Sequence, residues 1–67
     1  MCLSTVYRGT SPDPENKLAE YVVGVDIKGA NIHLTSITGE ELDLRGAISH
    51  IDLVSGKIFL STEVQPL

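Results

Sequence analysis

Six glycines and three prolines divide this sequence into short segments, and this punctuation constrains its fold more than any other feature. Between these residues apolar side chains alternate with polar ones, as at Leu42 and Leu44 or at Ile32 and Leu34. A repeat of two residues is typical of β-strands with one buried face, whereas a helix needs apolar residues three or four positions apart. The sequence therefore predicts an all-β protein of short strands joined by tight turns.

The alternation and the turn signals predict six strands in a single domain that spans residues 1–67. Short consecutive strands with tight turns favour a small six-stranded antiparallel barrel or sandwich. Gly46 marks a corner of that sheet, and Ser55-Gly56 has the chemistry of a two-residue hairpin turn. The tail after residue 63 contains Pro66 and is expected to fray. The expected strands are 2–7, 18–28, 32–37, 41–45, 47–54 and 57–63.

Two parts of this pattern have more than one interpretation. Alternation in the second strand places Val23, Val25 and Ile27 on its core face, although helix formers in the segment 14–23 also allow a helical turn there. Elsewhere three apolar residues fall on faces opposite the main core set, where they form either a second core layer or a patch for dimerisation. These three residues are Val6, Ile48 and Phe59. The segment 8–17 contains two prolines and is the one long loop.

Charge and composition exclude several classes of protein. The net charge is -4, and 42% of the residues are hydrophobic, too many for a disordered acidic tail. No apolar run approaches the ~20 residues that cross a bilayer, and the features of a secretory signal are missing. One cysteine cannot form an internal disulfide. We therefore expect a soluble cytoplasmic protein with no membrane partner.

Nucleic-acid binding and catalysis both have weak support in the sequence. The basic residues stand singly near acidic ones, and only three aromatic side chains are present for base stacking. A small RNA-binding β-barrel module is therefore the alternative function and not the first. A nucleophilic site would need Cys2, either His33 or His50, and a carboxylate such as Asp52, but these residues match no catalytic signature. We expect that the protein is not an enzyme.

The chain is short for a domain that folds alone. A domain of about 60 residues buries only about 60% of the surface that its unfolded chain exposes. Neither a disulfide nor a cluster of zinc ligands is present to compensate, which leaves association with another chain as the usual stabiliser. This favours a homodimer.

Cys2 has the clearest chemical potential of any residue in the sequence. If Met1 is removed, the Cys2 thiol and the free α-amine chelate one ion in a five-membered ring. Nitrogen and sulfur ligands in a plane suit Ni(II) or Cu(II) better than zinc, and a two-fold dimer supplies four of them. If Met1 is kept, its amine and the Cys2 amide nitrogen join the thiolate instead. The alternative role for Cys2 is that of a small buried hydrophobic residue.

Several segments, taken in order, resemble the CooT family, small nickel-binding accessory proteins first described with nickel-dependent carbon monoxide dehydrogenase. The opening Met1–Tyr7 is similar to the start of the family, and the similarity continues through the Val22–Val25 strand. Further similar segments are 37–41, 46–48 and 51–58. Together they cover nearly the whole chain.

The resemblance implies an SH3-like barrel and a homodimer, with one Ni(II) held at the dimer interface by Cys2 of both chains. It also implies a metallochaperone or storage role in the maturation of a nickel enzyme such as carbon monoxide dehydrogenase. Only Cys2 carries over as a metal ligand, because His33 and His50 match no ligand position of the family. The family has also been labelled as predicted RNA-binding, which the negative charge of this chain does not support.

Overall fold

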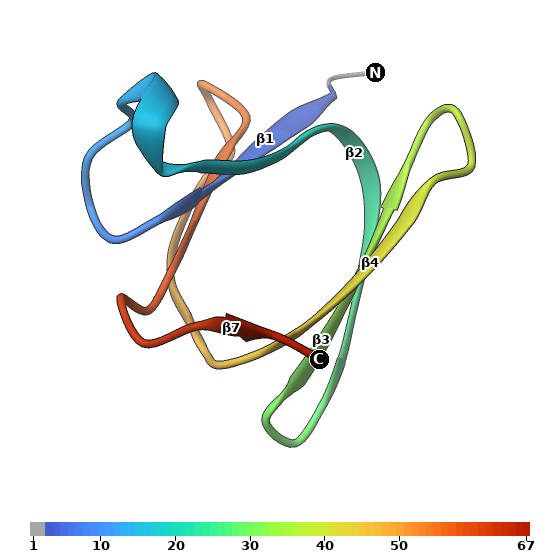
Figure 1. Ribbon diagram of the computed structural model, residues 1–67. Coiled ribbons are helices and arrows are strands. Elements are labelled where there is room, and N and C mark those ends of the chain that lie inside the picture. Colours follow the sequence, from blue (N-terminus) through green and yellow to red (C-terminus); the bar gives the residue numbers. More distant parts are fainter. Residues whose placement is uncertain (1–2) are drawn as a thin grey trace.

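The computed structural model describes residues 3–67, which form one strongly curved sheet of seven strands (Figure 1). The order across the sheet is β5-β6-β1-β2-β3-β4-β7. These strands are β1 (Ser4–Arg8), β2 (Lys17–Lys28), β3 (Asn31–Ser36), β4 (Glu41–Arg45), β5 (Ile48–Asp52), β6 (Lys57–Leu60) and β7 (Gln65–Pro66). The prediction of an all-β protein is confirmed.

The prediction of six antiparallel strands is wrong in two respects. First, β7 is a seventh strand and pairs with the end of β4. The tail is anchored there because Val64, just before β7, is fully buried in the core. Second, the sheet is mixed. β1 lies between β6 and β2, and it pairs in parallel with β6 and antiparallel with β2. Among the described residues the terminal strands β5 and β7 do not pair, so backbone pairing does not close the sheet into a barrel.

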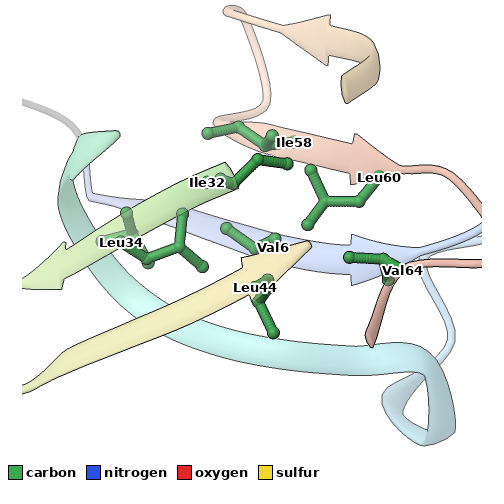
Figure 2. Packing of buried hydrophobic residues seen from close by; sticks show 8 residues of the cluster. Val6, Ile32, Leu34, Leu44, Ile58, Leu60 and Val64 are labelled. Atoms are coloured by element: carbon green, nitrogen blue, oxygen red, sulfur yellow. The ribbon is translucent and has the colours of Figure 1, made fainter. Parts of the chain in front are cut away.

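The core lies on the concave side of the sheet and takes side chains from most of its strands (Figure 2). Alternation predicted the contributions of β3, β4 and β6 correctly, as Ile32, Leu34 and Leu44 illustrate. The buried core cluster consists of Val6, Val22, Ile32, Leu34, Leu44, Ile58, Leu60 and Val64. Burial of this apolar surface is the main stabilising contribution to the fold.

The three apolar residues with two possible roles belong to the interior. Val6 is fully buried, and Ile48 packs against the core cluster. The buried ring of Phe59 stacks on Tyr7 with 5.7 Å between the ring centroids. Val6 and Ile48 thus belong to the main core, and only Phe59 lies outside that cluster, buried against Tyr7.

The predicted core face of β2 is largely wrong. Val22 is 3% exposed, whereas Val23 and Ile27 are 47% and 56% exposed, and only Val25 of the predicted set packs against the core. The cause is an irregularity in the strand. Tyr21 has a left-handed backbone with φ of 57°, and the pairing register shifts directly after Val22. The extra residue after Val22 lets Val22 and Val25 both face the core, whereas Val23 is exposed. Ile27 pairs with the buried Ile32 but lies near the end of the strand, where it stays exposed.

β5 is shorter than predicted and also contains a register shift. The segment 53–56 forms a four-residue loop in place of the expected two-residue turn, with Gly56 in a left-handed conformation that favours glycine. Alternation over the predicted strand 47–54 places Ile51 and Leu53 opposite Ile48, on the expected core face, but both are exposed. Gly46 lies at a bend between β4 and β5, as predicted, and a Cβ atom there would lie only 2.8 Å from Val64 Cγ2.

The segment between β1 and β2 contains the only helical turn of the described residues, a 3-10 helix at Pro14–Asn16. The helical turn that the sequence allowed within 14–23 is thus present, but it ends at Asn16 because β2 begins at Lys17. Proline at the first helical position is favourable, since its missing N–H has no partner there in any case. Within residues 3–67, no helix has the length and apolar character to cross a membrane.

Candidate functional site

The start of β1 is the described segment closest in sequence to the predicted metal ligand. Cys2 itself lies outside the described residues. Two residues further along, Ser4 pairs with Val22 in the middle of β2. On the other side, the Thr5 backbone N–H donates to the Gly56 carbonyl at 2.9 Å. The chain therefore enters β1 between the bend of β2 and the loop that joins β5 to β6.

That loop, here called the apolar loop (Leu53–Gly56), carries the two most exposed large hydrophobic side chains among the described residues. Leu53 is 84% exposed and Val54 is 98% exposed. The side chain of Asp52 holds the loop in place, because its Oδ1 accepts hydrogen bonds from the backbone N–H of Val54 at 3.0 Å and of Ser55 at 3.1 Å. The hydrogen bond from the Ser55 backbone contributes most to holding the pKa of Asp52 below its usual value. The loop thus presents unpartnered apolar surface next to the start of β1.

His33 lies on β3 between two carboxylates of β4. Its Nε2 lies 2.7 Å from Glu41 Oε1, and its Nδ1 lies 2.5 Å from Asp43 Oδ1. An imidazole donates from both nitrogens only when it is protonated. The hydrogen bond to Asp43, followed by that to Glu41, accordingly raises the pKa of His33 above 6.5. Asp26 pairs with His33 from β2, so carboxylates face this histidine from both neighbouring strands.

These side chains do not form a metal centre. Among residues 3–67, no group of three His, Cys, Asp or Glu side chains has an arrangement that could hold a metal ion. The geometry around His33 explains this result, because its two nitrogens point in opposite directions toward Glu41 and Asp43. The three side chains therefore share no common point where an ion would fit.

The structure does not bring the two histidines together. His33 binds carboxylates of β4, whereas His50 lies on β5 and stacks on Phe59 with a centroid distance of 6.1 Å. Asp52, the possible catalytic carboxylate, is occupied by the backbone of the apolar loop. Neither His50 nor Asp52 has contacts that indicate a role in catalysis.

Four of the five basic residues form two small pairs, and the fifth, Lys57, pairs with Thr5. Lys28 and Arg45 are both partners of Asn31, one on each neighbouring strand. Arg8 directly follows Tyr7, which pairs with Lys17. Binding to a phosphate backbone relies on many such charges along one surface, because each neutralised phosphate adds to the affinity. The RNA-binding alternative gains no support from these pairs.

Sequence reasoning missed a groove of about 720 Å³ between the first half of β2 and the hairpin of β3 and β4. Its position depends on the left-handed backbone at Tyr21, which redirects β2 from β1 toward β3. The sequence carries no signal for this conformation, since tyrosine seldom adopts it.

One family model matches the chain, described as CO dehydrogenase accessory protein CooT, and it covers residues 1–61. The match begins before β1, includes Cys2 and ends just after β6. It describes an accessory protein and not a catalyst, in agreement with the expectation that the chain is not an enzyme. Among curated proteins, none matches this sequence.

Proposed function

Because the chain belongs to the CooT family of CO dehydrogenase accessory proteins, we propose that it binds nickel for the maturation of a nickel enzyme. In this proposal two chains form a homodimer in the cytoplasm, and one Ni(II) lies between the Cys2 residues of both chains. The protein delivers or stores the ion and catalyses no reaction. The client enzyme is one of the type of carbon monoxide dehydrogenase.

The chemistry of Cys2 supports nickel as the ion. A thiolate is a soft ligand, and a nearby amine or amide nitrogen completes a planar set that suits Ni(II). One chain provides two such ligands, and a two-fold partner provides the other two. The thiol must lose its proton before it binds, so nickel affinity rises with pH.

The exposed apolar loop is the main support for the proposed dimer. Two residues span at most about 7 Å, so Cys2 lies within that distance of Ser4, whose neighbour Thr5 is hydrogen-bonded to the loop at Gly56. An isologous interface uses the same patch on both chains. Burial of Leu53 and Val54 against their copies therefore brings the two N-terminal segments to the same place.

The resemblance also implied an SH3-like barrel, and we retain that fold as part of the proposal. The strong curvature of the sheet and its single core are compatible with a barrel of this type. The seventh strand and the parallel β1–β6 pair are the features that a comparison with such barrels has to explain.

Nickel titration of protein with an untagged N-terminus tests the proposal. Native mass spectrometry is expected to find one nickel ion per two chains, and absorbance is expected to report a thiolate–nickel transition. The variant Cys2→Ser is expected to lose the ion and keep its fold. Ser4→Ala is the matched control, since it changes a hydroxyl two residues away and leaves the thiol.

Stoichiometric nickel binding by Cys2→Ser would contradict the proposal. The same holds for one nickel ion per monomer in the unmodified protein. In both cases the ligands would have to come from other residues of a single chain.

A further inference from the structure

The groove beside β2 has an apolar floor that continues the core to the surface. Val22 and Leu34 lie at its base and are buried. Leu18, Ala19 and Leu42 line it and are half-buried, so part of each side chain remains open to water. The proposed nickel function uses none of these side chains.

Two strand edges without partners border this groove within the described part of the chain. The segment 17–20 of β2 pairs with β1 on one side only, because β3 joins β2 from Val22 onward. On β4, the partner strand β7 pairs with Leu44 and Arg45, and the Leu67 N–H donates to the Asp43 carbonyl at 3.1 Å, which leaves the edge at Glu41 and Leu42 open. Edges of this kind accept an extended peptide as an added strand, since their N–H and C=O groups lack strand partners.

The charges around the groove all have one sign. Its lining includes Glu20, Glu40 and Glu41 and no Lys, Arg or His. Glu20 forms an ion pair with Lys17 at 3.1 Å, and Glu41 contacts His33, whereas Glu40 has no ion pair within residues 3–67. A second, smaller groove, beside His33, is lined by acidic and basic residues together and has no such bias.

We propose that this groove binds an extended basic segment of a partner protein. An apolar side chain of that segment packs over Leu18 and Leu42, and flanking Lys or Arg side chains face Glu20 and Glu40. The charge pattern selects against nucleic acid and against acidic peptides, because like charges across an interface are costly. The proposal does not depend on nickel, although Val22 in the groove pairs with Ser4 and thus lies near the start of the chain.

Selection from a phage-displayed library of random decapeptides on the full-length protein tests this proposal. Enriched peptides are expected to combine Lys or Arg with a neighbouring large apolar residue. In a ¹⁵N-HSQC titration with one enriched peptide, shifts are expected at Leu18, Ala19, Glu40 and Leu42. The variant Glu20→Lys/Glu40→Lys is expected to weaken the peptide about ten-fold or more, since two attractive contacts become repulsive.

The matched control is Glu15→Lys/Glu63→Lys, which changes the net charge equally at two exposed positions that do not line the groove. It is expected to bind the peptide within about two-fold of the unmodified protein. Equal weakening in both variants, enriched peptides without basic residues, no enrichment at all, or shifts mapped elsewhere would each overturn the proposal. A change in oligomeric mass with Glu20→Lys/Glu40→Lys alone would identify a second copy of the chain as the occupant and would overturn it as well.

Discussion

Replacement of Val54 by lysine should dissociate the proposed dimer with little effect on the monomer. Val54 is 98% exposed in the single chain, so almost its whole side chain is available for burial by a partner. Full burial of a valine is worth about 1.5–3 kcal/mol, and a two-fold interface contains two copies. Val54→Lys therefore costs at most about 3–6 kcal/mol, or roughly 10²–10⁴ in the dimer dissociation constant.

Sedimentation equilibrium over a series of protein concentrations measures this constant. Ile27→Lys is the matched control, because it makes the same exchange at a residue that is 56% exposed. Ile27 lies five residues beyond Val22 along β2, about 16 Å away from the start of β1. Its replacement is expected to leave the dissociation constant unchanged. Nickel stoichiometry should fall together with dimerisation in Val54→Lys and not in Ile27→Lys.

The reasoning is refuted if Val54→Lys dimerises within about three-fold of the unmodified protein, a difference of less than ~0.7 kcal/mol. An equal loss of dimer in Val54→Lys and Ile27→Lys would also refute it. The added positive charge, and not the loss of apolar surface at the loop, would then account for the weaker association. Circular dichroism separates dissociation from unfolding. A surface exchange at Val54 should change the unfolding free energy by less than about 0.5 kcal/mol.

Two further predictions concern the stability of the sheet. The raised pKa of His33 means that its protonation adds stability fully below pH 6.5, and this contribution is lost as the pH rises through the raised value. Urea unfolding across that range should detect the loss in the unmodified protein and a flat profile in His33→Gln, and equal slopes would contradict the ion pairs. Gly46→Ala should cost about 1–3 kcal/mol, because the new Cβ meets Val64 Cγ2 at 2.8 Å. Val64→Ala should cost a similar amount through the cavity it leaves, and thermal melts of the double variant should find less than the sum, whereas strict additivity would exclude this contact.

The sequence predicted the fold class and the core residues of β3 and β4 because their alternation is unbroken. In β3, Ile32 and Leu34 are separated by one residue and both are buried. Leu44 in β4 follows the same rule, whereas in β6 Phe59 is buried between Ile58 and Leu60. Alternation is a sufficient signal wherever a strand is regular from end to end, since side chains then point to the two faces in turn.

β2 and β5 were misjudged because the rule fails at an inserted residue. The register shift after Val22 moved Val23 to the surface. In β5 the shift lets both Ile48 and Ile51 pair with buried residues of β6, but Ile51 stays exposed because β5 is an edge strand. In β2 the shift coincides with a left-handed tyrosine, and no propensity marks such a residue as a bulge. The seventh strand was missed for a different reason, since a single fully buried residue, Val64, holds it in place.

Some features of the candidate site could likewise be predicted from the sequence, and others could not. Cys2 was found from its chemistry and its position in the sequence, neither of which requires a fold. The apolar loop and the groove could be identified only from the folded structure. Leu53 was expected in the core, and the groove combines Leu18 with Leu42, which no local pattern connects.

The irregularity at Tyr21 links these observations. β2 pairs with β1 up to Val22 and with β3 from Val22 onward, so the strand changes partners next to this point (Figure 1). The left-handed backbone makes that change possible, and the Tyr21 carbonyl is still satisfied by the Ile37 N–H at 2.9 Å. A regular strand would keep a single neighbour on each side along its whole length. Its first half would then have no open edge, and the acidic groove next to the start of β1 would not exist.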